Sequence, residues 1–413
     1  MRQAGYPSST FVYSGLSAIT ANTTLYVSAS GNDTTGDGSS GSPWRTITKA
    51  FDYLKNRWIN TDVAVTIQLA DGNNGDHVYT SEIAPNHPCG SQITIKGENT
   101  HSKSMTSVQS SSGSAGDYSV ILNLDSVADI EANDYVMISG AANGTNPTYV
   151  MGIHKVTNVD SGNSRITINS LHKTGVPSGA VTATVLVLKT VVNFNGCDGF
   201  VVRNGHHINL ENLAIVGNGT SNTVGVFAGG DDTANDYASC GGSITCVTGT
   251  VGVSGFAQGY LAQYSGSIRA DSSTASGNSQ QGYVAQSCGS IRADSSTASG
   301  NSEPGYLAQF SGSIRAYAST ASGNSRQGYV AQYSGSISAG SSTASGNSEP
   351  GYVAQSCGSI WANSSTSNNN TYGYYAYSYG YIRANGYSAS GNSTAALSPA
   401  ANTQGNEYGY IDT

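Results

Sequence analysis

Residues 259–281 read GYLAQYSGSIRADSSTASGNSQQ, and residues 282–304 read GYVAQSCGSIRADSSTASGNSEP. The Gly-Tyr pair that opens each unit recurs every 23 residues up to Gly351-Tyr352, and a looser copy begins at Gly373. Repeats built from helix pairs need about 33 residues or more, and no leucine-rich pattern is present. Each unit instead offers three short β-prone stretches separated by turns. The repeat therefore predicts an all-β protein, a parallel β-helix with rungs of about 23 residues that stack to bury their inner faces.

Alternation along each strand predicts which columns of side chains face the core. Ile268 and Ala270 are expected to point inward and Arg269 outward, as are their equivalents one rung further on. The Tyr260 column has two interpretations. Outward tyrosines would form an aromatic ladder suited to sugar rings, whereas inward tyrosines would leave the Leu261 column as an exposed apolar stripe. Either orientation leaves an outward column to be covered, and we therefore expect a homotrimer.

The segment before the repeats predicts a cap for the rod. Residues 45–59, RTITKAFDYLKNRWI, carry apolar side chains at helical spacing. The positions concerned are Ile47, Ala50, Phe51, Leu54 and Trp58. A helix here would cover the first rung, whose edges and core are otherwise open. Strands are expected in LYVSAS, VAVTIQLA, HVYTSEI and QITIKGEN.

The stretch LYVSASGNDTTGDGSSGSPWRTITKAFDYL, followed by short strands and KGEN, resembles the opening of right-handed parallel β-helix proteins of the pectin-lyase-like superfamily. The GYxAQ and STASGNS repeats resemble those of phage tail fibres and tailspikes. The resemblance implies a right-handed, single-stranded β-helix. It implies no one activity, since that superfamily holds lyases, hydrolases and binding proteins.

Composition shifts divide the chain into five parts. Residues 107–116 are rich in Ser and Gly and suggest a linker, and the longer aliphatic strands after them suggest a small inserted β-barrel-like module. The expected parts are an N-terminal arm for docking to a virion or partner (1–23), the capping helix with the first rungs (24–100), the linker and inserted module (101–190), the β-helix (191–393) and a C-terminal cap (394–413).

Charge and hydropathy restrict the function classes. The formal net charge is −8 and only 10% of residues are charged, which argues against nucleic acid as a partner. No apolar stretch approaches about 18 residues, so membrane insertion is not expected. Residues 1–23 lack the apolar core of a signal peptide. We therefore expect a virion protein, a tail appendage assembled in the host cytoplasm.

Carboxylate clusters offer candidates for catalysis. A glycosidase needs two carboxyl groups about 5 to 9.5 Å apart. Asp231, Asp232 and Asp236 form the densest acidic cluster, and Glu211 is a further candidate. The cluster resembles one motif of polygalacturonases, whose other motifs are missing, and a solvated turn loop or a fortuitous ion site explains it better. The six Cys lack the spacing of a zinc site, and we expect no cofactor or metal.

The expected function is recognition of host surface polysaccharide by a tailspike or tail-fibre-like receptor-binding protein. A depolymerase on the same fold, acting as glycoside hydrolase or lyase, and a passive structural or adhesive rod are the alternatives, and we lean away from an enzyme. Arg offers bidentate hydrogen bonds to acidic groups, and the arginine column has a neutralising Asp beside only two of its members. The candidate glycan-binding residues are Arg269, Arg292, Arg315, Trp361, Tyr260 and Tyr283.

Overall fold

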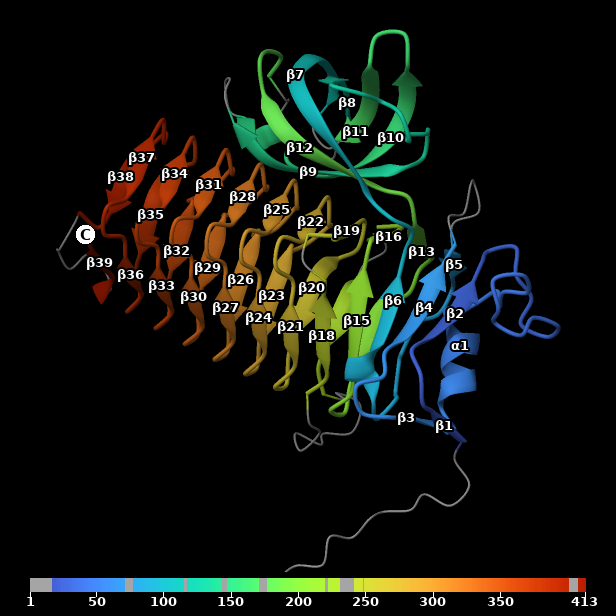
Figure 1. Ribbon diagram of the computed structural model, residues 1–413. Coiled ribbons are helices and arrows are strands. Elements are labelled where there is room, and N and C mark those ends of the chain that lie inside the picture. The colour runs from blue at the N-terminus through green and yellow to red at the C-terminus, as the bar shows by residue number, and fades with distance from the viewer. Residues whose placement is uncertain are drawn as a thin grey trace, which may run out of the picture.

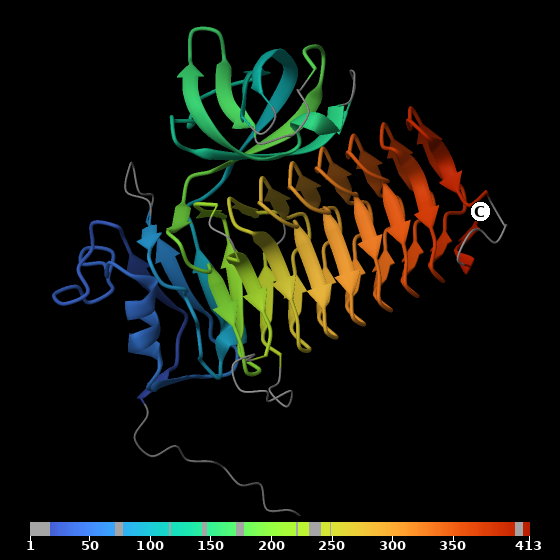
Figure 2. The same ribbon diagram turned by 180° about the vertical axis from the view of Figure 1, so that it is seen from behind.

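The computed structural model describes residues 17–70, 77–114, 117–142, 147–170, 177–219, 222–230, 241–247, 249–400 and 408–413. Within these residues the chain forms a rod of stacked β rungs, with a small barrel lying over one of its faces (Figure 1). Figure 2 shows the same barrel from behind, above the rungs near the middle of the rod. The fold class is thus a parallel β-helix with an inserted β module, as the repeats predict.

Three parallel sheets run along the rod, and each regular rung from β20 to β37 contributes one strand to each sheet. The sheet that carries the arginine column, here called the arginine sheet, contains β2 Thr23–Val27, β4 Val65–Leu69, β6 Ile93–Lys96, β15 His207–Glu211, β18 Ser243–Cys246, β21 Ser267–Arg269, β24 Ser290–Arg292, β27 Ser313–Arg315, β30 Ser336–Ser338, β33 Ser359–Trp361, β36 Tyr381–Arg383 and β39 Tyr410–Asp412. The tyrosine sheet contains β14 Phe200–Val202, β17 Val224–Ala228, β20 Gln258–Ala262, β23 Tyr283–Gln286, β26 Tyr306–Gln309, β29 Tyr329–Ala331, β32 Tyr352–Ala354, β35 Tyr372–Ala376 and β38 Ala395–Ser398. The barrel-side sheet contains β5 His77–Tyr79, β13 Val191–Phe194, β16 Leu213–Gly217, β19 Val251–Ser254, β22 Thr274–Ser276, β25 Thr297–Ser299, β28 Thr320–Ser322, β31 Thr343–Ser345, β34 Thr366–Asn368 and β37 Ser388–Ser390.

The core is built from columns of identical side chains in register. Ile268 pairs with Ile291, and both are buried, as is the alanine column two residues further on. Tyr260 stacks on Tyr283 with ring centroids 4.7 Å apart and planes 2° from parallel. Both tyrosines are completely buried, so the inward interpretation of this column is correct. Ring faces that stack at one rung spacing hide large apolar areas from water.

The apolar column beside the tyrosines is covered within the single chain, contrary to the exposed stripe that the sequence suggests. Leu261 is 5% exposed and Val284 is fully buried. Neighbours in this column lie one rung apart and form a hydrophobic cluster of their own, so each side chain covers the next. Tyr375 and Tyr377 pack against the same cluster near the C-terminal end.

An asparagine column closes the turns of the repeat. Asn278 donates from Nδ2 to Oδ1 of Asn301 at 2.9 Å, and Asn301 donates in the same way to Asn324 at 3.0 Å. These side chains are buried, and each also accepts from a backbone N–H of the preceding rung. The column thus satisfies buried polar groups at the SGNS turns, which explains why this turn sequence repeats.

The capping helix is present but shorter than predicted. Helix α1 spans Ile47–Leu54, and its side chains Ile47, Ala50 and Leu54 are buried in the rod core. Thr46 caps it by accepting a hydrogen bond from the N–H of Lys49 at 3.1 Å. The expected continuation to Trp58 is wrong. Residues Arg57–Ile59 form strand β3, which pairs with β1 Ser17–Ile19, and Trp58 is 41% exposed.

The inserted module is a closed six-stranded antiparallel barrel. Its strands are β7 His101–Ser114, β8 Asp117–Leu124, β9 Tyr135–Ala142, β10 Gly152–Asp160, β11 Arg165–Ser170 and β12 Thr182–Leu188. The 3₁₀ helices η1 Gly90–Gln92 and η2 Pro147–Val150 precede β6 and β10. Residues 107–114, expected to form a linker, instead belong to β7 and pair with β8. No helix in the described residues is long and apolar enough to cross a membrane.

The C-terminal segment continues the rod. Strand β38 extends the tyrosine sheet beside β35, and β39 extends the arginine sheet beside β36. Ile411 pairs with Ile382 and is completely buried. Residues 394–400 and 408–413 therefore add two further strands in rung positions, although their sequence departs from the repeat.

Candidate functional site

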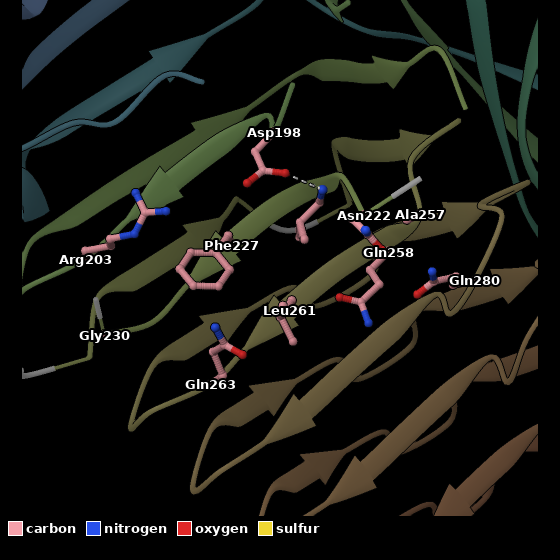
Figure 3. A pocket seen from close by; sticks show the side chains of 11 residues that line it. Asp198, Arg203, Asn222, Phe227, Gly230, Ala257, Gln258, Leu261, Gln263 and Gln280 are labelled. Atoms are coloured by element: carbon pink, nitrogen blue, oxygen red, sulfur yellow. Dashed lines mark hydrogen bonds between the residues drawn. The ribbon is translucent and has the colours of Figure 1, made fainter. Parts of the chain in front are cut away.

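A groove of about 340 Å³ opens on the outer face of the tyrosine sheet, where the rungs before the regular repeats meet the first regular rung (Figure 3). Strands β14, β17 and β20 carry most of its walls. Phe227 and Leu261, neighbours in the apolar column, lie at its centre. The residues lining it are Asp198, Arg203, Asn222, Val224, Phe227, Gly230, Ala257, Gln258, Leu261, Gln263 and Gln280.

A glycine in the column of Gln263 leaves space for this groove. The pairing of β17 with β20 places Gly229 one rung before Gln263, and the pairing of β14 with β17 places Arg203 one rung before Gly229. A Cβ at Gly229 would lie 2.6 Å from the Phe227 ring and 3.2 Å from Cγ of Gln263. The absence of a side chain therefore separates Arg203 from Gln263 and leaves space beside the Phe227 ring, which is itself 6% exposed.

A ladder of glutamine amides ends at this groove. Gln286 donates from Nε2 to Oε1 of Gln263 at 2.8 Å, and Gln309 and Gln332 continue the ladder with the same distance at each step. Every amide points the same way, with its NH₂ group toward the N-terminal end of the rod. Aligned hydrogen bonds polarise one another. Gln263 is the last member, so its amide NH₂ group is left as an oriented donor at the rim of the groove.

Two ionisable side chains, Asp198 and Arg203, also line the groove. Asp198 accepts a hydrogen bond from the N–H of Val224 at 2.8 Å. The pKa of Asp198 is raised, chiefly because burial disfavours the carboxylate, and the nearby Glu82 adds to this effect while the Val224 N–H and Arg203 oppose it. Arg203 is itself paired with Glu82 at 2.9 Å and lies 5.2 Å from the centre of the Phe227 ring. The groove thus holds a partly buried carboxyl group, a guanidinium and several amides around an apolar centre.

The acidic cluster named from the sequence lies outside the described residues. Asp231, Asp232 and Asp236 all fall in the segment 231–240, which is outside the described range. Gly230, the residue directly before Asp231 in the chain, lines the groove. The candidates therefore follow directly after a groove residue in sequence.

Glu211 lies on a different sheet and has a structural partner. Its carboxylate is 2.7 Å from Nζ of Lys96, which faces it across the neighbouring strands β6 and β15. Both side chains are partly exposed. The structure therefore does not bring Glu211 together with the groove on the tyrosine sheet.

The arginine column is exposed and internally neutralised. Arg269 lies 2.8 Å from Asp271, and Arg292 lies 3.1 Å from both Asp271 and Asp294. Arg315, which the sequence leaves without a carboxylate, pairs with Asp294 of the rung before it at 3.1 Å. The expectation that Arg315 lacks an acidic neighbour is therefore wrong. Its role in glycan binding stays a prediction.

The aromatic candidates divide into one exposed and two buried side chains. Trp361 lies on the same sheet as the arginine column and is 56% exposed. Tyr260 and Tyr283 are wrong as glycan-binding residues, because both rings are stacked in the rod core and have no exposed surface. Sequence reasoning missed the groove residues Asp198, Phe227, Gln258 and Gln263; the first two lie in rungs without a repeat, and the last two lie at the start of strand β20 of the first regular rung and directly after its end.

The cysteines in the described residues form no further site. Cys288 and Cys357 are exposed free thiols on separate rungs, and Cys246 is buried, which raises the pKa of its thiol to about 12. Within the parts of the chain that the structure describes, no group of three or more His, Cys, Asp or Glu side chains could hold a metal ion.

The comparisons with known proteins identify similar folds only. No protein family and no curated protein matches the chain. Among solved structures, the complex of XylC with xylose is 11% identical over 89% of this chain and 66% of that chain, with a TM-score of 0.26. The tailspike protein gp49 from Pseudomonas phage LKA1 is 11% identical over 78% of this chain and 64% of that chain, with a TM-score of 0.26.

The catalytic domain of a GH87 alpha-1,3-glucanase in complex with tetrasaccharides is 9% identical over 76% of this chain and 98% of that chain, with a TM-score of 0.27. This chain spans slightly less than two thirds of the length of the first two. Similarities of this size carry no information about activity. The assignment to a β-helix rests on the strand pairing described above.

Proposed function

We propose that this protein is a receptor-binding protein of a viral tail and that it binds a host surface polysaccharide in the groove of the tyrosine sheet. The observation that carries the proposal is the apolar centre of Phe227 and Leu261, rimmed by polar groups with fixed orientations. A sugar ring offers an apolar face of C–H groups and an edge of hydroxyl groups. Aromatic or aliphatic floors with a few placed polar groups suit such a ligand.

The charges of the groove favour a neutral polysaccharide. Asp198 is the one carboxyl group and Arg203 the one guanidinium among the lining residues, and Glu82, outside the lining, pairs with Arg203. A uronate or phosphate brought into this groove would meet those carboxylates, and like charges in a partly buried site repel. The amides of Gln258 and Gln263 can instead donate to and accept from sugar hydroxyl groups.

Attachment to a virion is the second part of the proposal. The repeats resemble those of tail fibres and tailspikes, and residues 1–23 would dock to the tail or an adaptor protein, with residues 1–16 outside the described range. A homotrimer remains part of this proposal. Light scattering at micromolar concentration tests it, and a monodisperse monomer would contradict it.

The binding test compares the groove with the arginine sheet. We expect immobilised neutral oligosaccharides to retain the wild-type protein, and Asp198→Asn and Gln263→Leu to weaken retention about tenfold, as lost hydrogen bonds to a ligand would. Asn at position 198 can still accept from the Val224 N–H, so folding should be preserved. The control is the double variant Arg292→Ala/Arg315→Ala on the arginine sheet.

Unchanged retention by the control supports the groove. Loss of retention in the control but not in the groove variants would transfer the site to the arginine column. No retention of any oligosaccharide by the wild-type protein would favour a passive structural rod.

A polysaccharide hydrolase is a second candidate function. The observation that favours it is the pair of Asp198, whose pKa is raised by burial, and Glu82, which is held by Arg203. Glycoside hydrolysis needs one carboxyl group that acts as general acid and a second carboxyl group near it. We would expect new reducing ends from a polysaccharide that the protein retains, and their loss in Asp198→Asn. Retention without new reducing ends would exclude this candidate.

A further inference from the structure

A second cavity, of about 360 Å³, lies between the barrel and the barrel-side sheet. The barrel crosses this sheet above β19, β22 and β25 (Figures 1 and 2). The barrel forms the roof of the cavity and the rungs form its floor. Its lining residues are Met137, Ser139, Gly140, Met151, Thr184 and Leu186 from the barrel, and Gly249, Ser272, Thr274, Ser295, Thr297, Ala318 and Thr320 from the rod.

The barrel is fixed to the rod by a serine column beside this cavity. The N–H of Ile153 donates to Oγ of Ser276 at 2.8 Å, and Oγ of Ser299 donates to the same oxygen at 3.1 Å. One rung further on, Ser322 donates to the carbonyl oxygen of Thr148 at 3.0 Å. A Cβ at Gly252 would lie 2.4 Å from Cδ1 of Ile153, so the glycine permits this close approach. The serine hydroxyls are therefore used in docking the barrel.

The threonine column two residues before the serines is not used in this way. Thr274 pairs in register with Thr297, and Thr297 with Thr320, so their side chains lie one rung apart along the floor. Thr274 is 1% exposed and Thr297 is 2% exposed. Neither Oγ1 atom makes a hydrogen bond to another described residue, and neither is sealed within the protein, because both residues line the cavity. Their hydroxyl groups are therefore available to a ligand that enters it.

The roof supplies apolar contacts. Met137, Met151 and Leu186 face the threonines across the cavity, and the two methionines are almost completely buried. None of the lining residues carries a charge. An anionic or cationic ligand would therefore lose its hydration without gaining a counter-charge. The cavity suits a ligand with hydroxyl groups on one side and an apolar face on the other.

We infer that this cleft binds a segment of neutral glycan, as a second site separate from the groove on the tyrosine sheet. Its hydroxyl groups would pair with Thr274 and Thr297, while its C–H face would lie against the methionines of the roof. The floor repeats at each rung, so an extended chain of sugars along the rod axis meets the same hydroxyl group at successive rungs. The inference does not depend on the groove.

The test is calorimetric titration of the full chain with maltohexaose, cellohexaose and xylohexaose. Thr274→Val/Thr297→Val removes both hydroxyl groups and keeps β-branched side chains that suit a strand. Thr343→Val/Thr366→Val is a matched control in the same column, beyond the lining of the cavity. We expect the first variant to bind at least one of these glycans about tenfold more weakly than the wild type, and the control to bind it normally.

Equal affinities for the two double variants would overturn the inference, as would a wild-type protein that binds none of the three glycans. The groove variant Asp198→Asn separates the two sites. If Asp198→Asn abolishes all binding and Thr274→Val/Thr297→Val changes nothing, the groove is the binding site and the cleft is not. If only Thr274→Val/Thr297→Val weakens binding, the cleft is the binding site and the groove is not. Thermal unfolding of each variant checks that the fold is intact.

Discussion

Nε of Arg315 lies 3.1 Å from the carboxylate of Asp294, a residue of the preceding rung, and the same carboxylate lies 3.1 Å from Nε of Arg292. One aspartate thus serves two arginines on successive rungs. Asp294 also accepts a hydrogen bond from the N–H of Tyr317 at 3.1 Å. A charge column that looks self-repelling in the sequence is in fact a cross-rung network, because stacking brings together residues 21 positions apart.

Replacing Asp294 with Asn should destabilise the rod by about 1 kcal/mol, because two guanidinium groups lose their shared carboxylate. Arg315→Ala should cost less, since that side chain is 58% exposed and screened by solvent. Urea unfolding at low and high salt measures both changes, and the loss in Asp294→Asn should shrink at high salt. A larger loss in Arg315→Ala than in Asp294→Asn would contradict this account.

Two tyrosines of the buried ladder should respond differently to loss of the hydroxyl group. The hydroxyl of Tyr306 shares a hydrogen bond of 2.9 Å with Ser296, whereas that of Tyr283 has no partner among the described residues. Tyr306→Phe should cost about 1 kcal/mol of unfolding free energy, and Tyr283→Phe should be neutral or stabilising. Denaturant unfolding of the two variants compares identical chemical changes in one column. Equal losses would show that the hydrogen bond to Ser296 is not what distinguishes them.

Acid should lower the folding stability of the barrel, because one buried histidine resists protonation. His154 is completely buried, which lowers its pKa to about 4 from an ordinary value near 6.5. The unfolded barrel therefore binds a proton between about pH 6.5 and 4 that the folded barrel excludes. Stability is full above this window and falls as the pH drops through it, by on the order of 3 kcal/mol.

Hydrogen exchange of peptides from β10 at pH 7 and pH 4 measures this effect. His154→Gln keeps a donor for the carbonyl oxygen of Val150 and removes the titration, so its acid sensitivity should be smaller. If wild type and variant lose protection in parallel, another group is responsible for the acid response.

Removal of residues 401–413 should expose the end of the rod. Strand β39 covers Ile382 with Ile411, which is completely buried. Without it the last core isoleucine and the edge of the arginine sheet are open, and exposed edges and apolar surface promote aggregation. We expect a lower melting temperature and soluble aggregates in size-exclusion chromatography. The control is Asp412→Ala, which keeps the strand, and a truncated protein that stayed monodisperse with unchanged melting would refute the capping role.

The regular rungs could be predicted from the sequence because one period places identical residues in register. The alternation that assigns Ile268 and Arg269 to opposite faces needs no knowledge beyond strand geometry. The burial of Leu261 could not be predicted in this way. An outward position normally implies exposure, but at one rung spacing the apolar neighbours cover one another. The argument for a homotrimer from an exposed stripe therefore fails, and the trimer stays a prediction.

The groove and the C-terminal end of the helix could not be predicted from the sequence. Asp198 and Phe227 lie in rungs that do not repeat, so no column of identical residues reveals their register. Gly229 was the available signal, because a glycine in a strand-like run often marks a place where another group approaches closely. Trp58 fits the helical spacing, but residues 57–59 pair with β1, and this long-range pairing overrides the local pattern. The Ser-rich run 107–114 has the composition of a linker, but its long-range pairing with β8 makes it part of strand β7.

The in-register columns have a consequence for the evolution of this molecule. Units 259–281 and 282–304 are nearly identical over 23 residues, and the strand pairing between neighbouring rungs joins equivalent positions. A recombination event that duplicates or deletes one whole unit would preserve each tyrosine, isoleucine and asparagine column and shift only the distal end by one rung. The proximal rungs that carry the groove and the barrel would be unchanged. The number of repeat units in the gene therefore sets the length of the rod.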